Sequence, residues 1–332
     1  MQTKIRNYSI TTALFALLLM LSSGIGTVSA GGPIWTANSG WDLPDVGQGS
    51  APALADLDDD GDYDLLLGNN SGIALGYENT GSANSPVWTR RSSWDVYAVV
   101  GYGGTKVAFA DLDDDSDYDL LLGEGPTSAT LAYENTGSVN TPSWTRKTGW
   151  DGPTLQYPGA KPALADLDSD GDHDLILSQA FNGSIYAYEN TGSASSPTWT
   201  RKSSWDPPFV GQGATPDLAD LDYDGDYDLL IGKKDNGTTY AYENTGGASS
   251  PAWTRKYSWD PQDVTQLSAK PALADLDNDG DYDLLLGTMD GVTLGFENIA
   301  SVQMPAITAP GFLLSLILLL VLAAIVMRRM HG

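Results

Sequence analysis

The chain has no cysteine and only two histidines, His173 and His331, among 332 residues. Without cysteine, no disulfide bond, thiolate metal site or cysteine nucleophile can form. With so few imidazoles, histidine-based catalysis and zinc binding have almost no side chains to use. Basic residues are also scarce, with 17 lysines and arginines against 43 aspartates and glutamates. The sequence shows no basic patch of the kind that nucleic acid binding requires.

The acidity is concentrated in five short loops. These loops hold 6, 6, 5, 5 and 5 aspartates, 27 of the 43 acidic residues, which leaves 16 acids against 17 bases elsewhere. The net charge of −26 therefore indicates a local chemical role and not a general adaptation of the surface.

The first thirty residues are typical of a secretory signal peptide. Lys4 and Arg6 give a charged start, ALFALLLML is apolar, and Val28-Ser29-Ala30 supplies small residues for cleavage. We expect residues 1–30 to be removed and the remainder to be exported. An uncleaved amino-terminal anchor is the alternative, which the short apolar run disfavours.

The last residues predict a membrane anchor. Residues 312–327 are apolar and are followed by Arg328 and Arg329. A helix within 311–332 reaches the minimum length that spans a bilayer, and the arginine pair predicts a cytoplasmic carboxyl terminus. Residues 301–310 form a short linker before it. A buried core helix is the less favoured alternative.

A unit of about 55 residues occurs five times, beginning with PALADLDDDGDYDLLLG at 52–68. The first aspartates of the five copies are Asp56, Asp111, Asp166, Asp220 and Asp275. Each copy is also marked by a Tyr-Glu-Asn or Phe-Glu-Asn motif, and Trp-Thr and Trp-Asp motifs recur five times each. These motifs use all ten tryptophans, which we expect to pack between repeats.

Each copy predicts four short β-strands. In the first copy, PALAD and YDLLLG flank the aspartate loop, IALGYEN follows, and PVWTR comes after a turn. β-Branched and aromatic residues, punctuated by glycine, asparagine and serine, favour strands over helices. Four strands in each of five repeats predict an all-β fold, a five-bladed β-propeller over residues 31–300.

The phase of the repeat predicts how the ring closes. A single fourth-strand segment around Trp35 precedes the first full copy, and the last copy ends at Asn298 without a fourth strand. We expect the amino-terminal strand to complete the final blade, which joins the ends and hides two sheet edges. An open solenoid would have no use for this offset.

The aspartate loops have the composition of a calcium site. In DLDDDGDYD, carboxylates at positions 1, 3, 5 and 9, the position-7 carbonyl and water supply the six to eight oxygens that Ca²⁺ prefers. Glycine at position 6 permits a sharp bend. Leucine or isoleucine at position 12 excludes an EF-hand, and a flexible cage of protein oxygens matches Mg²⁺ poorly.

We therefore predict up to five calcium ions, one in each blade. In blade 2, Ser116 replaces the glycine of position 6, which predicts a strained, weak or empty site. The candidate metal residues are Asp56, Asp58, Asp60, Asp62 and Asp64; Asp111, Asp113, Asp115, Asp117 and Asp119; Asp166, Asp168, Asp170, Asp172 and Asp174; Asp220, Asp222, Asp224, Asp226 and Asp228; and Asp275, Asp277, Asp279, Asp281 and Asp283.

The pattern D-x-D-x-D-G-x-x-D-L-L-L-G, framed by short strands, resembles the FG-GAP and VCBS repeats of integrin α-subunit propellers and microbial surface proteins. The resemblance covers residues 33–299. It implies Ca²⁺ binding by the matching aspartates, in the first blade Asp56, Asp58, Asp60 and Asp64. Those propellers usually have seven blades, whereas the repeats here predict five.

The segment Pro310-Gly311-Phe312, with its apolar helix and basic end, resembles the PGF-type sorting signal of archaeal surface proteins. The resemblance implies removal of the tail and its replacement by a lipid anchor. Those proteins usually carry a long threonine-rich spacer, which is absent here. Whether the helix is retained or replaced, we expect the protein to be held at the outer face of a membrane.

The connections between blades vary and lie on the face opposite to the aspartate loops. Varied loops on a repeated scaffold are a common place for binding. Tyr97, Tyr102, Tyr157 and Phe209 are candidate contacts for a sugar or a protein, although they could equally cover their own blades. The candidate glycosylation sites are Asn69, Asn182 and Asn236.

These features favour a calcium-stabilised, non-enzymatic module at the cell surface that recognises an extracellular protein or glycan. A calcium-dependent lectin and a structural envelope protein are the alternatives. A propeller-based hydrolase is the weakest one, because no Ser/His/Asp set or isolated carboxylate pair stands out. Asp217 replaces the alanine found at its position in the other copies, and Asp263 is a further acid outside the aspartate loops.

Overall fold

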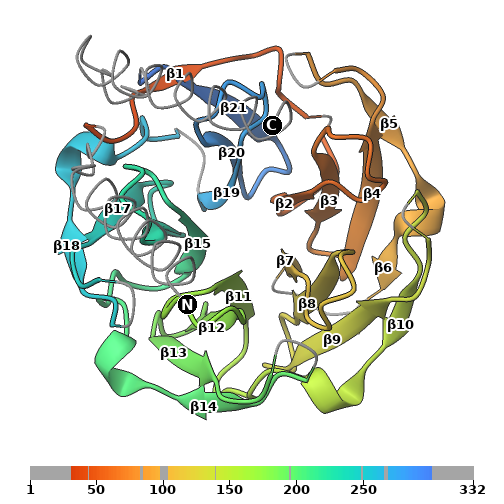
Figure 1. Ribbon diagram of the computed structural model, residues 1–332. Helices are drawn as coiled ribbons and strands as arrows, with labels where there is room; N and C mark the ends of the chain where they lie inside the picture. Colours follow the sequence, from red (N-terminus) through yellow and green to blue (C-terminus); the bar gives the residue numbers. More distant parts are fainter. Residues whose placement is uncertain are drawn as a thin grey trace, which may run out of the picture. The chain divides into compact units, whose positions relative to one another are not determined.

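The computed structural model describes residues 31–300, except for 44, 83–84, 98–103, 139, 194–195, 248–249 and 265–267. The described residues form five antiparallel sheets of four strands around a central axis (Figure 1). The predicted all-β, five-bladed β-propeller is thus confirmed. The described residues include no helix that is long and apolar enough to cross a membrane. The predicted signal peptide (1–30), linker (301–310) and anchoring helix (311–332) lie outside them.

The strands follow the predicted repeat, and each blade is numbered from its innermost strand outwards. Blade 1 contains β2 (Ala51–Ala55), β3 (Asp64–Gly68), β4 (Ile73–Asn79) and β5 (Trp88–Arg90). Blade 2 contains β7 (Lys106–Ala110), β8 (Asp119–Gly123), β9 (Thr130–Asn135) and β10 (Trp144–Arg146). Blade 3 contains β11 (Ala160–Ala165), β12 (Asp174–Gln179), β13 (Ile185–Asn190) and β14 (Trp199–Arg201). Blade 4 contains β15 (Thr215–Ala219), β16 (Asp228–Gly232), β17 (Thr239–Asn244) and β18 (Trp253–Arg255). Blade 5 contains β19 (Lys270–Ala274), β20 (Asp283–Gly287), β21 (Thr293–Asn298) and β1 (Trp35–Ala37).

Short elements follow the outermost strands. Among the described residues, four 3₁₀ helices are found: η1 (Ser92–Trp94), η2 (Thr148–Trp150), η3 (Ser203–Trp205) and η4 (Tyr257–Trp259). Each contains the tryptophan of a Trp-Asp motif, which is buried. A two-residue strand, β6 (Val96–Tyr97), pairs with β4 as an addition to blade 1 that the sequence pattern did not predict.

The ring closes through the amino-terminal strand, as predicted. Strand β1 pairs antiparallel with β21, with Trp35 opposite Asn298 and Ala37 opposite Phe296. The first and last strands of the ring therefore share one sheet, in which β21 is paired on both sides and β1 forms the outer edge of blade 5.

The hydrophobic core lies between neighbouring blades. The second strand of each blade is buried along its whole length, because both faces of its sheet are covered. In one of five similar clusters, Leu65 and Leu67 of blade 1 pack with Ala272 and Leu285 of blade 5. Burial of each leucine side chain contributes about 1.5–3 kcal/mol, so every blade stabilises its neighbours.

Tryptophan side chains join consecutive blades, in agreement with their predicted position. The indole nitrogen of Trp144 donates to the carbonyl of Trp94, at 2.9 Å, from the Trp-Thr motif of one blade to the Trp-Asp motif of the preceding one. The equivalent bond from Trp35, on the closing strand β1, to the carbonyl of Trp259 is 2.8 Å long. The repeat therefore specifies the contact between blades as well as the blade itself.

The glycine that ends the second strand lets the next blade approach closely. A Cβ on Gly68 would lie 2.1 Å from the carbonyl oxygen of Thr105, so any side chain there would clash with the backbone. In blade 3 the equivalent residue is Ser178, whose hydroxyl donates to the carbonyl of Ala214 at 2.6 Å. The exception is thus accommodated by a hydrogen bond.

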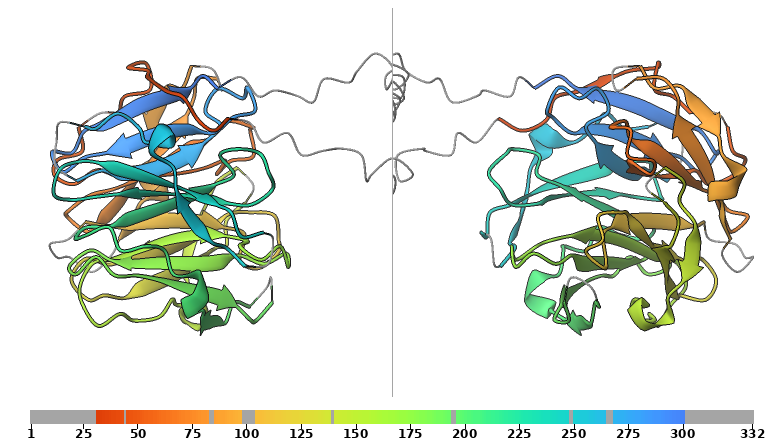
Figure 2. Two further views of the ribbon diagram at one scale, coloured as in Figure 1. Left: turned by 90° about the vertical axis from the view of Figure 1, so that its left-hand side faces the viewer. Right: turned by 45° about the vertical axis from the view of Figure 1, so that its right-hand side comes forward.

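The loops at the two ends of the strands form two faces, which Figure 2 shows from the side. The aspartate loops and the loops that precede the outermost strands share one face, since Asn140 donates to the carbonyl of Asp58 in the adjacent blade at 2.7 Å. This face is called the aspartate face below. The remaining connections form the opposite face, as predicted.

Candidate calcium sites

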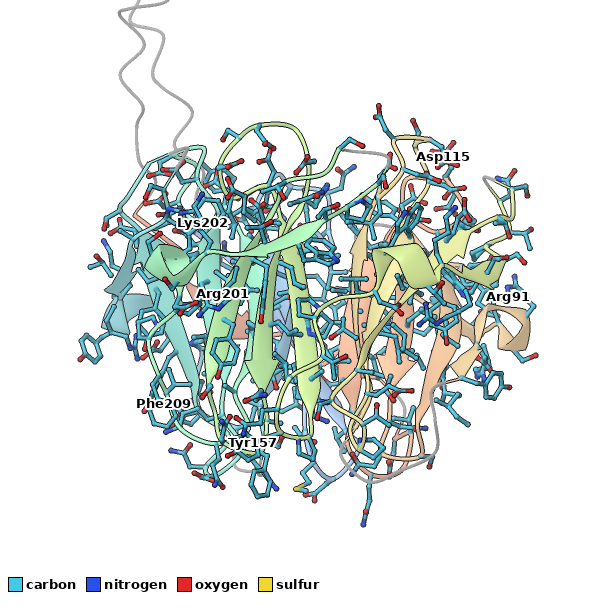
Figure 3. All side chains as sticks on the ribbon, turned by 90° about the horizontal axis from the view of Figure 1, so that it is seen from below. Arg91, Asp115, Tyr157, Arg201, Lys202 and Phe209 are labelled. Atoms are coloured by element: carbon cyan, nitrogen blue, oxygen red, sulfur yellow. The ribbon has the colours of Figure 1, made fainter. Side chains whose placement is uncertain are left out.

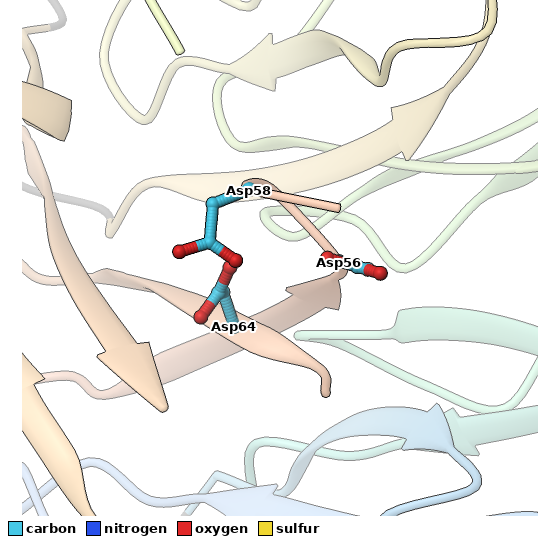
Figure 4. Close-up of side chains that lie close together, drawn as sticks. All are labelled: Asp56, Asp58 and Asp64. Carbon is cyan, nitrogen blue, oxygen red and sulfur yellow. The ribbon is translucent and has the colours of Figure 1, made fainter. Parts of the chain in front are cut away.

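All five aspartate loops bring three carboxylates together. In each loop, one oxygen from each of three aspartates lies within 4.8 Å of the other two. Figure 4 shows the group in blade 1. The five groups are Asp56, Asp58 and Asp64; Asp111, Asp113 and Asp115; Asp166, Asp168 and Asp174; Asp220, Asp222 and Asp228; and Asp275, Asp277 and Asp279. Positions 1 and 3 thus take part in every blade, joined by position 9 in three blades and by position 5 in two.

Backbone hydrogen bonds to the aspartates fix the shape of the loop. In blade 1 the carboxylate of Asp56 accepts the N–H groups of Asp60, at 3.2 Å, and Gly61, at 3.0 Å. The carboxylate of Asp60 accepts the N–H group of Asp62 at 2.9 Å. These short-range bonds hold positions 1 and 5 in place without a metal ion.

The aspartate at position 9 has a structural role that the sequence did not reveal. Asp64 is fully buried and accepts the N–H groups of Leu57, at 2.9 Å, and Asn79, at 2.8 Å. It therefore ties the start of the loop to the end of the third strand, and the same two bonds occur in every blade. Burial raises the pKa of Asp64 to about 8 despite these two donors.

Several carboxylate oxygens in the loops are buried without a hydrogen-bond donor. Within the described residues, they belong to position 3 (Asp58, Asp113 and Asp168) and position 7 (Asp117, Asp172 and Asp281). At 4.8 Å and an effective dielectric constant of about 20, two carboxylates repel each other by about 3.5 kcal/mol. Burial, together with Asp60, Glu78 and Asp56, raises the pKa of Asp58 to about 6. Oxygens that face one another without donors fit a hard divalent cation such as Ca²⁺.

The aspartates at position 7 lie beside these groups and not within them. Burial and then the carboxylate of Asp279, at position 5, raise the pKa of Asp281 to about 7. These side chains add negative charge around the site, and the contribution of the position-7 backbone carbonyl stays a prediction.

The blade 2 loop has the same conformation as the others. Ser116 adopts a φ of 76°, close to the 92° of Gly61, and its N–H group donates to Asp111 at 2.9 Å. A left-handed conformation costs a non-glycine residue about 1–2 kcal/mol. The predicted strain is therefore present, yet the three carboxylates still converge.

A further carboxylate lies next to each of four loops. This carboxylate is the glutamate of the Tyr-Glu-Asn or Phe-Glu-Asn motif, which is Glu78 in blade 1. Glu78 raises the pKa of the position-3 aspartate there, after the larger contributions of burial and of the position-5 aspartate. Glu134, Glu189 and Glu297 act in the same way. Glu78 also pairs with Arg91. The sequence signal for this residue is its strict recurrence in the motif.

The side chains at position 8 face the central axis. Burial and the neighbouring Tyr118 and Tyr282 raise the pKa of Tyr63 to about 12. A cavity of about 430 Å³ opens here, lined by Tyr63, Tyr118 and Asp275 among others. His173 holds the same position in blade 3 and is half-buried, with its pKa lowered by burial.

On the opposite face, the predicted aromatic contacts are exposed. Figure 3 places Tyr157 and Phe209 at the end of the molecule away from Asp115. Phe209 is 70% exposed, Tyr97 is 65% exposed on β6, and Tyr157 is 39% exposed. Phe181, which the sequence analysis did not select, is 62% exposed and stacks on Tyr157 with 6.0 Å between ring centres. Tyr102 lies outside the described residues.

The three candidate glycosylation sites differ in accessibility. Asn69 is only 6% exposed, and its side-chain oxygen accepts the N–H group of Ser71 at 2.9 Å. A buried amide is a poor acceptor for a bulky glycan, which argues against this site. Asn182 is half-buried and Asn236 is exposed.

Comparisons with known proteins agree with the repeat. Residues 166–231 and 220–286 match the FG-GAP-like repeat. No curated protein matches the chain.

Two solved structures show limited likeness. One is a lectin of Agrocybe aegerita, described as recognising non-reducing terminal N-acetylglucosamine, with 19% identity and a TM-score of 0.39. The match covers 75% of this chain and 63% of the lectin. The other is BBS1N in complex with ARL6DN, with 11% identity and a TM-score of 0.38, covering 81% of this chain and 98% of that one. With its five aspartate loops in phase and its closed ring, the chain is a five-bladed β-propeller, and its residues 166–286 match the FG-GAP-like repeat.

Proposed function

We propose that the chain is a calcium-stabilised β-propeller at the cell surface that acts as a non-enzymatic recognition or adhesion module for a protein or glycan. The observation that carries the proposal is the division between the two faces. All five aspartate groups are on one face, whereas exposed aromatic side chains occupy varied loops on the other.

Calcium acts in this proposal as a structural clamp. The loops are shaped by backbone hydrogen bonds, and their mutually repelling carboxylates are stabilised when a cation binds. An ion held by positions 1, 3, 5 and 9 ties the loop to the third strand through the buried position-9 aspartate. The same bonds recur in each blade, so five ions would rigidify the whole face.

Two observations support a non-enzymatic role. Asp217, an acid that could have been catalytic, forms an ion pair with Lys106 inside the ring. The aspartates of the five loops share one architecture, which offers no distinctive catalytic arrangement. The sequences of residues 1–30 and 311–332 support export and anchoring at the outer face of a membrane, by the helix itself or by a lipid that replaces it.

Binding of the purified, fluorescently labelled full-length chain to intact cells tests the proposal. We expect saturable binding in calcium that is lost in excess EDTA. Loss after glycosidase treatment would indicate a glycan partner and loss after protease treatment a protein partner. The absence of saturable binding to cells and to a glycan array at micromolar concentration would contradict the proposal.

A further inference from the structure

Three lysines point into the axis of the ring from its innermost strands. Lys106, Lys161 and Lys270 occupy the same position in the repeat, five residues before the first aspartate, where the other two blades carry Ala51 and Thr215. Their exposed fractions are 1%, 2% and 6%. Buried ammonium groups are costly, so three of them around one axis require an explanation.

The ammonium group of Lys106 has its partners inside the protein. Its ammonium group donates to the carbonyls of Pro52, at 3.0 Å, and Pro271, at 3.1 Å, and lies 3.7 Å from the carboxylate of Asp217. It thus contacts blades 1, 5 and 4 from its own position in blade 2. A small cavity of about 100 Å³ is lined by this ion pair.

Lys161 and Lys270 converge nearer to the opposite face. Their ammonium groups donate to the carbonyls of Gly104 and Gly49, respectively. A Cβ placed on Gly104 would lie 3.7 Å from Nζ of Lys161 and 3.6 Å from Nζ of Lys270. The two positive charges therefore share one small region. Burial and then the charge of Lys106 lower the pKa of Lys161 to about 7, and that of Lys270 is lowered by burial, Lys161 and Lys106.

The two ammonium groups line a cavity that is built by the whole ring. Its volume is about 370 Å³, and the loop between the second and third strands of each blade contributes to its wall. These contributions are Asn70, Gly125, Phe181, Lys234 and Met289, in blade order. Lys234 brings a third ammonium group to the wall. This volume suits a single sugar residue and not a folded domain.

An aromatic surface stands beside the charges. Phe181 lines the cavity and is 62% exposed, and its ring stacks on Tyr157 with an interplanar angle of 21°. An exposed aromatic face packs against the apolar C–H face of a sugar ring, while ammonium groups bind a carboxylate by charge-assisted hydrogen bonds.

We propose that this cavity binds an acidic sugar, with its carboxylate on Lys161 and Lys270 and its ring against Phe181. An anion brought between the two ammonium groups offsets their repulsion, which a neutral sugar cannot do. The inference deepens the recognition role proposed above and rests on it, because it names hexuronic acids as the ligand class.

Calorimetric titration of the full-length, calcium-loaded chain with glucuronic and galacturonic acid tests the site. We expect binding of at least one acid, with glucose and galactose at least about tenfold weaker, because the neutral sugars lack the carboxylate. Lys161→Met and Lys270→Met should each weaken binding of the acid by about tenfold or more. Lys202→Met removes an equal charge from an ion pair between the residue after β14 and Glu189 of β13, and it should change binding less than about twofold.

Phe181→Ala separates the aromatic contact from the charges and leaves the buried lysines in place. It should weaken uronate binding by about fivefold or more and leave acetate binding unchanged. The proposal is overturned if glucose binds as well as glucuronate, if a polyglutamate peptide binds more tightly than both uronates, or if Lys270→Met has no effect. Cell binding that persists in the two lysine variants would overturn this inference alone. Uronate binding without any cell binding would overturn only the adhesion role.

Discussion

The ammonium group of Lys106 lies 3.7 Å from the carboxylate of Asp217, so an ion pair crosses the interior of the ring from blade 2 to blade 4. Four blades carry alanine at the position of Asp217, namely Ala53, Ala108, Ala163 and Ala272. The carboxylate also accepts the N–H group of Leu273 at 2.8 Å, which attaches the pair to blade 5. The aspartate that departs from the repeat in blade 4 thus pairs with one of the three axial lysines.

Asp217→Ala is expected to destabilise the protein even though it restores the residue of the other four blades. Lys106 is 1% exposed and would lose its only acidic partner among the described residues. Removal of one member of a buried pair costs about 3 kcal/mol or more, measurable by urea unfolding in saturating calcium. The double variant Lys106→Met/Asp217→Ala should recover most of this loss. A single variant as stable as the parent would contradict the assigned role.

Removal of calcium is expected to lower the melting temperature substantially. Each site at ten times its dissociation constant adds about 1.4 kcal/mol, and five sites together approach the net stability of a typical domain. Thermal unfolding followed by circular dichroism, with calcium and with excess EDTA, measures the difference. Magnesium in place of calcium serves as the control, and a transition that is unchanged in EDTA would refute a stabilising role for the ion.

Ser116→Gly is expected to stabilise blade 2. Ser116 has a φ of 76°, a conformation that glycine adopts without steric cost, so the change should gain about 1 kcal/mol and tighten the blade 2 site. Gly61→Ser makes the reverse change in blade 1 and should lose a similar amount. Urea unfolding and calcium titration of both variants test the pair. Equal effects of the same sign would show that φ at position 6 does not set loop stability.

The lysines in the axial cavity predict an unusual dependence of stability on pH. The folded pKa of Lys161 is about 7, below its ordinary value of 10.5, so between these values the unfolded chain binds more protons. Stability should therefore rise from about pH 7.5 to about pH 9. The charged groups around it are Lys106, Lys270 and Lys234, and Asp217 pairs with Lys106.

Urea unfolding in saturating calcium, which keeps the loop carboxylates ionised, measures this dependence. Lys161→Met should flatten the rise, whereas Lys202→Met should leave it in place. Uronate affinity should change in the opposite direction and fall by up to about tenfold per pH unit above pH 7, because binding then requires a proton. Stability that falls over this range in the parent protein would contradict the assignment.

The repeat made most of the fold predictable from the sequence. Motifs such as Trp-Asp and Tyr-Glu-Asn recur in phase, and the unpaired segment around Trp35 indicated the closing strand, which β1 confirms. The convergence of the loop carboxylates was equally predictable, because the alternating aspartates are close in sequence and need only one tight turn to meet.

The axial features could not be read in the same way. Lys106, Lys161 and Lys270 are the first or second residues of innermost strands, where a lysine in a sequence is ordinarily solvent-exposed. Their proximity depends on three different blades meeting at one axis, which no local pattern encodes. The structural role of Asp64 could not be predicted for a related reason. Its second hydrogen-bond partner, Asn79, is fifteen residues away on another strand.

The pairing of β1 with β21 also sets the order of events during synthesis. Residues 35–37 leave the ribosome first among the strands, and their partners at 296–298 leave last. At about 5–20 residues per second, the first strand waits for about 13–50 seconds before its sheet exists. Blades 1 to 4 can form in turn as they emerge, but the ring itself cannot assemble until the final repeat is complete. An arrest in translation within the last repeat would leave an open arc of blades whose first strand, β1, is unpaired.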